Sequence, residues 1–266
     1  MFDSFNRRIT YLRVSVTDRC NLRCRYCMPA GGIELMPKDE VLSLEEIAEV
    51  IRQGAMLGIT KIRLTGGEPL VRKGIVHLVE MISQVEGIQE VAMTTNGVLL
   101  DKYAADLKKA GLTRVNISLD TLDAEDFKNI TRLGNLEDVK RGIAAARDAG
   151  LTPIKINTVK TPSSKKQDID ALKQFCANEG LSIRFIRQMD LETGDFSVVE
   201  GGEGGNCKIC NRLRLMANGE IKPCLFSGKG FNVKEHGIKE AFMLALGAKP
   251  ARGTVSKNHK FYNIGG

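Results

Sequence analysis

Six short runs with strand character recur along the first 190 residues, and stretches with helical patterns separate them. The runs are "YLRVSVT" (11–17), "KIRLTGG" (61–67), "VAMTTNG" (91–97), "RVNISLD" (114–120), "PIKINTV" (153–159) and "SIRFIRQMD" (182–190). Alternation of strands with helices predicts a parallel sheet joined by right-handed crossovers. Since a closed barrel of this type needs eight units, six units predict an α/β fold, an open (partial) TIM-type (βα)6 barrel.

The clearest helix signal begins at Ser43, where Glu46 stands three residues further on and completes a capping box. Gly58 suits the C-terminal end of this helix. Apolar residues recur between them at helical spacing: Leu44, Ile47, Ala48, Ile51 and Ala55. We therefore expect an amphipathic helix over this stretch.

The predicted strands alternate apolar and polar residues. A parallel strand that is covered on both faces usually reads as a continuous apolar run. One apolar face predicts packing against outer helices, and one polar face predicts an open lumen in place of a packed barrel interior. Against one acid, Asp120, the polar positions hold five basic residues: Arg13, Lys61, Arg63, Lys155 and Arg184. This pattern predicts a cationic cavity for an anionic ligand; the alternative is a solvated face on edge strands.

The overall charge limits the kinds of ligand and location. Lys and Arg number 39 against 32 Asp and Glu, but only 5% of residues are aromatic and none is Trp. Because single-stranded nucleic acid is bound on aromatic platforms, a small polyanion is the better expectation. No run approaches the roughly 20 apolar residues of a membrane span, and the start lacks the apolar core of a signal peptide. We expect a cytoplasmic protein, whose thiols stay reduced.

Six of the seven cysteines form two groups of three, while Cys176 lies in a helical pattern and is expected to be a small core residue. The first group, "CNLRCRYC", follows the first strand, at the barrel edge where such enzymes keep their active sites. Iron–sulfur clusters usually take four thiolates, so three thiolates would leave one iron free. A structural zinc site needs a fourth ligand, and no histidine stands nearby; zinc remains the alternative.

The second group lies in "CKICNRLRLMANGEIKPC", at Cys207, Cys210 and Cys224. The Asn-Gly pair predicts a hairpin that brings Cys224 back towards the other two. A zinc ribbon usually has a second CxxC, so a single third cysteine favours another cluster with an open iron. Arg212 and Arg214 share one face if this stretch is extended, and guanidinium groups suit phosphates; the alternative is a solvated strand face.

The first cysteine motif, with Tyr26 inside it, and the "GGEP" after the second strand resemble the signature of radical S-adenosylmethionine (SAM) enzymes. The resemblance implies a [4Fe-4S] cluster held by Cys20, Cys24 and Cys27, whose free iron chelates SAM. Reductive cleavage of SAM then gives a 5′-deoxyadenosyl radical. By the same resemblance the residues that contact SAM are Tyr26, Gly66, Gly67, Glu68, Thr94, Ser118, Asn157 and Met189, although several could instead be satisfied polar or core residues.

The whole set of motifs is similar to the GTP 3′,8-cyclase family of molybdenum-cofactor biosynthesis, over about residues 5–190 and 206–266. The matching stretches are "SVTDRCNLRCRYCMP", "LTGGEPLVR", "TTNG", "VNISLD", "CNRLRL…GEIKPCLF" and the terminal "IGG". The resemblance implies a lyase reaction, in which the radical takes the ribose 3′ hydrogen of GTP and the resulting carbon radical attacks guanine C8. It also implies a second [4Fe-4S] cluster, on Cys207, Cys210 and Cys224, that binds the guanine.

The resemblance further assigns the arginines of both regions to the triphosphate: Arg13, Arg63, Arg184, Arg212 and Arg214. Lys61 and Lys155 belong to the same cationic face and are counted with the GTP contacts. The tail Gly265-Gly266 resembles a family ending that reaches into the active site; from the residues alone it is a flexible terminus. An external electron donor and a transient contact with the next pathway enzyme are implied, and a homodimer is left open.

The sequence divides into a barrel (1–190), a Gly-rich connection (191–206) and a C-terminal auxiliary cluster segment with its tail (207–266). Relatives carry several dozen residues before the second cysteine motif, and these help to wall the barrel. Here the connection has a linker-like composition, which fits a natural shortening, an engineered truncation or a partner that covers the gap. Because radical chemistry needs shielding, a cyclase that cleaves SAM without cyclising GTP is an alternative.

Two further alternatives stay open at this stage. One is a radical SAM enzyme that acts on another substrate, such as a peptide, and uses its second cluster as an auxiliary. Such an enzyme has no need of five cations in the lumen. The other is a non-catalytic metal-binding or nucleic-acid-binding protein, which predicts zinc and no SAM turnover.

Overall fold

The computed structural model describes residues 1–162, 164–190 and 193–255. Within them the strands form one sheet in the order β6-β5-β4-β3-β2-β1-β7-β8-β9. The six predicted runs all form strands: β1 (Tyr11–Ser15), β2 (Lys61–Thr65), β3 (Glu90–Thr95), β4 (Arg114–Ser118), β5 (Lys155–Lys160) and β6 (Ser182–Arg187). These six pair in parallel, each with its neighbour in sequence.

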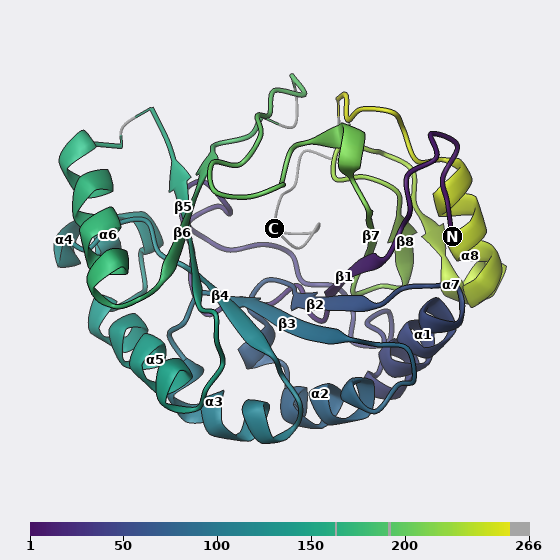
Figure 1. Ribbon diagram of the computed structural model, residues 1–266, viewed down its shortest axis with the longest axis horizontal. Helices are drawn as coiled ribbons and strands as arrows, with labels where there is room; N and C mark the ends of the chain where they lie inside the picture. Colours follow the sequence, from purple (N-terminus) through teal and green to yellow (C-terminus); the bar gives the residue numbers. More distant parts are fainter. Residues whose placement is uncertain (163, 191–192, 256–266) are drawn as a thin grey trace.

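Helices cover the outer, convex side of this curved sheet, which does not close on itself (Figure 1). They are α1 (Leu44–Met56), α2 (Ile75–Ser83), α3 (Leu100–Lys109), α4 (Ala124–Thr131), α5 (Leu136–Asp148) and α6 (Lys166–Asn178). Both α4 and α5 lie between β4 and β5, and the short helix η1 (Pro69–Val71) follows β2. The predicted open (βα)6 barrel is therefore confirmed. No helix in the described part of the chain is long and apolar enough to cross a membrane.

The predicted start of α1 is also confirmed. The Ser43 side chain accepts from the backbone N–H of Glu46, and the Glu46 carboxylate accepts from the N–H of Ser43, at 3.1 and 2.7 Å. Leu57 caps the C-terminus, and Gly58 follows it with φ of +101°. Glycine suits this left-handed position, which ends the helix.

The apolar positions of the strands form the core between the sheet and the outer helices. Leu12, Val14, Ile62 and Leu64 are fully buried there, as are their counterparts on β4 and β5. The predicted division into an apolar outer face and a polar inner face is confirmed for β1, β2 and β4, whereas β3 has Ala92 in the inner phase and Thr95 in the outer phase.

The C-terminal segment extends the same sheet. It comprises η2 (Cys207–Ile209), β7 (Arg212–Leu215), β8 (Glu220–Lys222), β9 (Phe231–Asn232), α7 (Val233–His236) and α8 (Ile238–Gly247). Strand β7 lies parallel to β1, and β8 returns antiparallel through the predicted Asn218–Gly219 turn. Phe242 of α8 is fully buried in the core of the barrel, so both cysteine motifs belong to one packed body.

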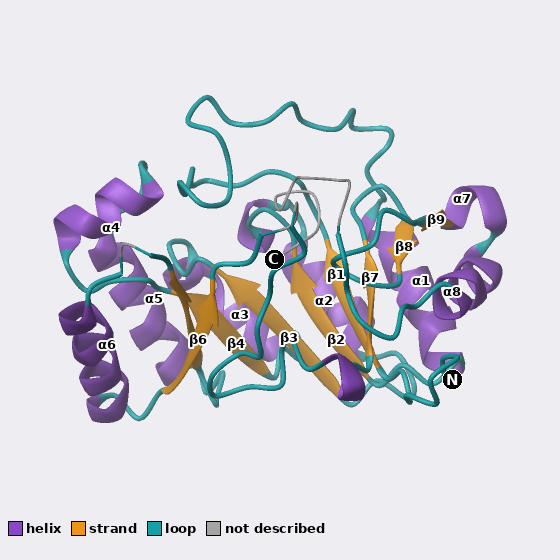
Figure 2. Ribbon diagram, turned by 90° about the horizontal axis from the view of Figure 1, so that it is seen from above, coloured by secondary structure: helices purple, strands orange, loops and turns teal. Residues whose placement is uncertain are grey.

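The connection between β6 and β7 is folded along its described part. The backbones of Glu200 and Phe185 exchange two hydrogen bonds of 3.0 and 3.1 Å across the free edge of β6. Phe196 stacks on Phe226, with ring centroids 4.6 Å apart. The connection thereby passes from the β6 end of the sheet to the second cysteine motif (Figure 2). Its linker-like composition does not prevent it from packing on both.

Candidate active site

The loops that follow β1 and β2 contact each other closely at the carboxyl edge of the sheet. The N–H of Gly67 donates to the carbonyl oxygen of Thr17, and the N–H of Glu68 donates to that of Arg19, both at 2.8 Å. A Cβ on Gly67 would lie 2.2 Å from the Arg19 oxygen. Contact with the first cysteine loop therefore requires a glycine at this position of "GGEP".

The carboxylate of Glu68 joins the β2 loop to the end of β3. It accepts from the Thr95 hydroxyl and from the Asn96 N–H, both at 2.7 Å, and from the Leu70 N–H at 3.0 Å. Burial raises the pKa of Glu68 to about 7, against the lowering effect of these hydrogen bonds. Its contact with SAM stays a prediction.

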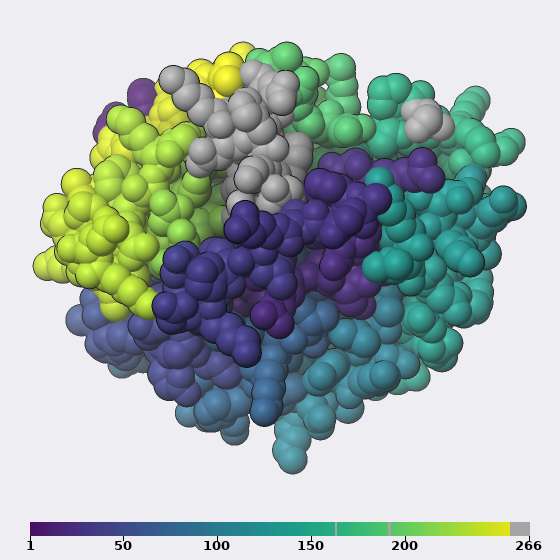
Figure 3. Space-filling view, turned by 180° about the vertical axis from the view of Figure 1, so that it is seen from behind, coloured from purple at the N-terminus to yellow at the C-terminus, as the bar shows by residue number. Residues whose placement is uncertain are grey.

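The first cysteine loop lies against the end of α4. The N–H groups of Arg23 and Arg25 donate to the carbonyls of Thr131 and Ile130 at 3.1 and 3.0 Å. The segment between β1 and α1, dark purple to blue, spreads over one face beside the teal helices (Figure 3). Within the loop, the N–H of Cys27 donates to the carbonyl of Cys24 at 3.0 Å. This tight turn holds the three thiols on one short segment.

The three thiols of this loop are free, half-buried and sensitive to one another's charge. Burial, reinforced by the neighbouring thiolates, raises the pKa of Cys24 to about 12 and that of Cys27 to about 11. Burial also raises the pKa of Cys20. Metal ligands of this type must be deprotonated to bind, so this site ionises fully only with a cationic centre in place.

The donor set fits an iron–sulfur cluster better than a single ion. No three His, Cys, Asp or Glu side chains converge on one metal position within the described ranges. A closed zinc site, the alternative considered from the sequence, requires such convergence on a single ion. Three soft thiols without a fourth donor suit a cluster that leaves one iron open.

Tyr26 connects the cysteine loop to the ends of β4 and β5. Its hydroxyl donates to Oδ2 of Asp120 at 2.7 Å, and Oδ1 of Asp120 accepts from the Val159 N–H at 2.8 Å. Burial and the charge of Asp120 raise the pKa of Tyr26 well above its ordinary value. The Tyr26 ring is thereby fixed at the carboxyl edge, beside the thiols.

The other predicted SAM contacts divide into two groups. Thr94, Ser118 and Asn157 lie on the concave face, with Ser118 directly opposite Asn157 in the register. The Thr94 hydroxyl is buried without a hydrogen-bond partner in the described structure, which is typical of a group that awaits a ligand. Met189 instead packs with Met216 and Phe226 beside the second cysteine motif.

Arginines from three neighbouring strands surround Tyr11 on the concave face. Arg13 lies between Arg63 on β2 and Arg214 on β7 in the register. Arg212 is opposite Tyr11, and the guanidinium carbons of Arg63 and Arg212 each lie 5.7 Å from the Tyr11 ring centroid. We name these five residues the arginine cluster.

The electrostatics of the arginine cluster favour an anion. Burial lowers the pKa of Arg13 to about 9, and the other arginines add to this effect while Tyr11 opposes it. Burial tends to raise the pKa of Tyr11, but the four arginines outweigh it and lower that pKa. The Nε atoms of Arg63 and Arg212 are buried and lack hydrogen-bond partners among the described residues. Like charges buried together are costly unless a counter-ion binds.

The remaining predicted GTP contacts flank the arginine cluster. Burial lowers the pKa of Lys155, and the nearby charges of Arg184, Arg114 and Arg63 add to this. The Nε of Arg184 donates to the Gly201 carbonyl at 3.2 Å, which attaches this arginine to the connection. Lys61 is exposed, at the register position between Tyr11 and Glu90.

The second cysteine motif lies at the amino end of β7. Burial tends to raise the pKa of Cys210, but Lys249 and Arg212 outweigh it and lower that pKa. Burial raises the pKa of Cys224. Both thiols act electrostatically on Arg214, so the arginine cluster borders this motif.

Four residues of the site escaped the sequence analysis. Tyr11 and Arg114 share the polar phase of their strands, so a count of every polar position, not only of charge, would have found them. Arg114 forms a 2.5 Å ion pair with Glu90, so its charge is already balanced within the protein. Arg7 and Lys249 contact the second motif across distances of 200 and 39 residues, and no local pattern indicates such contacts.

An open parallel barrel with a three-cysteine loop at its carboxyl edge defines a class of protein. Residues 14–176 match the Radical SAM superfamily. Among solved structures, SuiB of Streptococcus suis bound to S-adenosylmethionine has a TM-score of 0.67 and 17% identity over 92% of this chain and 65% of that chain. Native anSMEcpe with bound AdoMet has a TM-score of 0.65 and 14% identity over 88% and 80%. These likenesses show the fold.

Curated relatives narrow the class. The GTP 3′,8-cyclase of Thermodesulfovibrio yellowstonii is 42% identical over 281 residues, 88% of this chain and 87% of the relative. That of Alkaliphilus oremlandii is 38% identical over 314 residues, 100% and 98% of the two chains. This chain has 266 residues, so about 48 positions of that alignment have no counterpart in it. The chain belongs to the radical SAM superfamily and, within it, to the GTP 3′,8-cyclase family.

Proposed function

We propose that this protein converts GTP to 3′,8-cyclo-7,8-dihydro-GTP, a radical SAM lyase reaction of molybdenum-cofactor biosynthesis. The observation that carries the proposal is the arginine cluster, in which Arg13, Arg63, Arg212 and Arg214 surround Tyr11. Guanidinium groups bind phosphate oxygens in pairs, and the negative charge of a triphosphate would offset the positive charges gathered here. The relatives named as GTP 3′,8-cyclases support the same substrate.

The topology supports complementary roles for the two cysteine motifs around such a substrate. Cys20 follows β1 at the carboxyl edge, whereas Cys210 precedes the adjacent, parallel β7 at the amino edge. Five residues of β1 span roughly 16 Å. The arginine cluster lies on these strands, between the two edges, so a nucleotide bound there can extend its ribose towards one motif and its base towards the other.

In the proposed enzyme Cys20, Cys24 and Cys27 hold a [4Fe-4S] cluster and Cys207, Cys210 and Cys224 hold a second one. When bound, the first cluster supplies the electron that cleaves SAM to a radical able to abstract hydrogen. Thr94, Ser118 and Asn157 contact SAM in this proposal, with Tyr26 beside the thiols. The second motif holds the guanine, while the arginines bind the triphosphate and fix the ribose.

The chemistry requires an external electron donor, and the product would pass to the next enzyme of the pathway in the cytoplasm. The described part of the connection packs along β6 and onto Phe226. We infer that it takes the place of the longer wall of the relatives and shields the substrate.

The test is an anaerobic assay of the protein reconstituted with iron and sulfide, supplied with SAM, dithionite and GTP. Mass spectrometry quantifies 5′-deoxyadenosine and cyclised nucleotide. In wild type and in the surface control Arg141→Gln, we expect the formation of 5′-deoxyadenosine and of cyclised nucleotide to depend on GTP. In Arg212→Gln we expect the cyclised nucleotide to be lost. SAM cleavage without a GTP product would assign another substrate or an uncoupled enzyme. No cleavage with a verified first cluster would overturn catalysis.

A further inference from the structure

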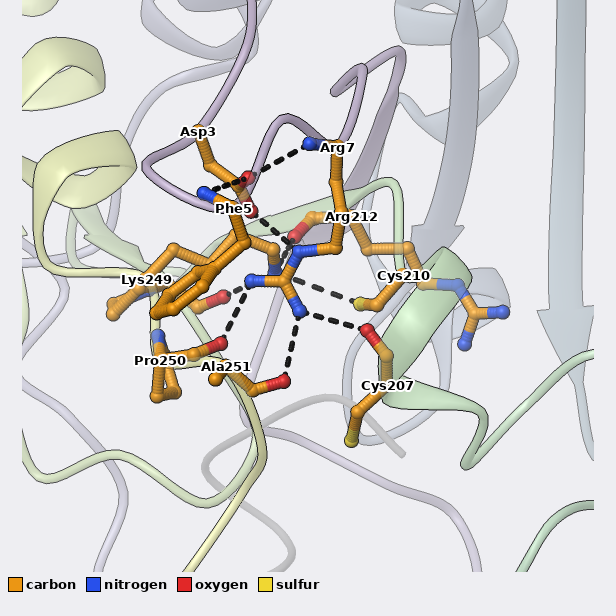
Figure 4. Close-up of polar contacts among 10 residues, drawn as sticks. Asp3, Phe5, Arg7, Cys207, Cys210, Arg212, Lys249, Pro250 and Ala251 are labelled. Atoms are coloured by element: carbon orange, nitrogen blue, oxygen red, sulfur yellow. Dashed lines mark hydrogen bonds and ion pairs between the residues drawn. The ribbon is translucent and has the colours of Figure 1, made fainter.

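A buried lysine from outside the cysteine motif contacts the second group of cysteines. Lys249 follows α8, and only 4% of its surface is exposed. Its ammonium donates to the carbonyl of Arg212 at 2.7 Å and to Sγ of Cys210 at 3.5 Å (Figure 4). It also donates to the carbonyl of Pro223 at 2.9 Å. These three contacts use all three donors of the ammonium group.

A buried arginine makes the matching contacts on the other side of the motif. Arg7 is oriented by Asp3, whose Oδ2 accepts from its Nε at 2.6 Å. Its two terminal nitrogens donate to the carbonyls of Cys207 at 2.7 Å, of Pro250 at 2.7 Å and of Ala251 at 3.0 Å. Figure 4 shows the guanidinium between the cysteine turn and the segment that carries Lys249.

Together the two cations hold every chain segment that bears a cysteine of this motif. Arg7 binds the backbone of Cys207 itself. Lys249 binds Arg212, two residues after Cys210, and Pro223, immediately before Cys224. One ammonium group therefore fixes the distance between the Cys210 and Cys224 segments. Arg7 connects the Lys249–Ala251 segment to the third cysteine segment, which carries Cys207.

We propose that Lys249 is a positioning residue of the second cluster, which preorganises its ligands and donates a hydrogen bond to the Cys210 sulfur. The inference rests on the proposed function, because it requires a cluster at this motif. Hydrogen bonds and positive charge beside the sulfurs stabilise the more negative, reduced form of a cluster. Lys249 thus raises the reduction potential of the second cluster and slows its loss of iron.

The test uses the full chain with Cys20, Cys24 and Cys27 changed to alanine, so that only the second motif binds iron. Lys249→Met removes the charge and the donors, and Lys249→Gln removes the charge while retaining a donor. Lys239→Met, at an exposed position of α8, is the matched control. Iron per chain, the rate of iron loss to a chelator and the midpoint potential in a dithionite titration followed by electron paramagnetic resonance are measured.

We expect Lys249→Met to lose iron about tenfold faster than the control, the scale typical of outer contacts to metal ligands. Both Lys249 variants should have a lower midpoint potential. Unchanged iron loss and potential would overturn the inference, even if thermal stability fell, because a purely structural lysine affects only stability. A parent chain that binds no cluster would overturn the second cluster itself. If the wild type cyclises GTP but the Lys249 variants keep the iron-loss rate and midpoint potential of the control, the inference about Lys249 is overturned while the proposed function stands.

Discussion

Two half-buried tyrosines of the site have opposite electrostatic surroundings. Tyr11 lies among four arginines, which lower its pKa although burial acts to raise it. Tyr26 donates to Asp120, and burial together with that carboxylate raises its pKa. The pKa of Tyr11 therefore reflects the positive charge at the centre of the concave face, and the pKa of Tyr26 reflects the negative charge at the carboxyl edge.

We predict that ultraviolet titration of the metal-free protein resolves these two tyrosines. One phenol should ionise below its ordinary pKa, and Tyr11→Phe should remove that step. Another should ionise well above it, and Tyr26→Phe should remove that one. If Tyr11→Phe instead removed a high-pH step, the arginines would not dominate its environment.

Glu68 gives a prediction for the pH dependence of stability. Its pKa is about 7 in the folded protein, against the ordinary value of 4.5. Between these values the folded state binds a proton that the unfolded state has released, so the free energy of unfolding falls as pH rises from about 4.5 to about 7. Urea unfolding of the metal-free protein across this range should show that fall.

In Glu68→Gln this component of the slope should disappear, because the amide does not titrate. The variant should also be less stable at every pH, since its NH2 group would face a backbone N–H that the carboxylate now accepts from. An identical slope in variant and wild type would contradict the raised pKa.

The first helix offers a test at the level of a single element. Ser43→Ala removes the side chain that accepts from the Glu46 N–H. Loss of an N-cap costs about 1 kcal/mol, which in a chain of this size lowers the melting temperature by about 2–4 °C. Calorimetry should detect this difference, whereas Ser4→Ala, at an exposed turn, should leave the melting temperature unchanged.

The sequence was sufficient for the elements whose signals are local. Alternation placed β1 to β6, and their polar phase placed Arg13 and Arg63 on one face. All of the six strands except β5 end earlier than the predicted runs. At β1 and β2 the residues that follow, such as Thr17 and Gly67, bond to neighbouring loops instead of a strand. Helix α1 was predictable from its capping box, its apolar stripe and the glycine at its end.

Elements held by distant contacts were not predictable in the same way. Strand β7 has only four residues, and its pairing with β1 spans some two hundred positions. The connection is Gly-rich, so its composition indicates a linker, while its fold depends on the free edge of β6 and on Phe226. Lys249 and Arg7 reach the second cysteine motif only once these elements are in place.

For the whole molecule, the cations gathered on the concave face make nucleotide binding depend on phosphate number. We predict that affinity decreases from GTP to GDP to GMP and that salt weakens it, because screening reduces each phosphate contact. Arg214→Gln should weaken GTP binding about tenfold or more, since it removes a charge-assisted hydrogen-bond donor. Isothermal titration calorimetry measures this, with Arg141→Gln on α5 as control; equal affinity for GTP and GMP would contradict it.

The last prediction concerns how the shortened chain shields a radical. The connection packs on the free edge of β6 and, through Phe196, on Phe226 beside Cys224. If it excludes solvent, wild type should form about one cyclised nucleotide for each 5′-deoxyadenosine, because radical intermediates are protected from side reactions. Phe196→Ala removes the stacked ring and should raise the ratio of 5′-deoxyadenosine to product.

Val198→Ala changes the same connection at a side chain that is 58% exposed, and its ratio should match wild type. An unchanged ratio in Phe196→Ala would show that the connection does not form the wall. A high ratio already in wild type would show that so short a connection does not shield the radical. The ratio of 5′-deoxyadenosine to cyclised nucleotide thus measures whether a short, folded connection is enough to protect the radical in an open barrel with two cysteine motifs.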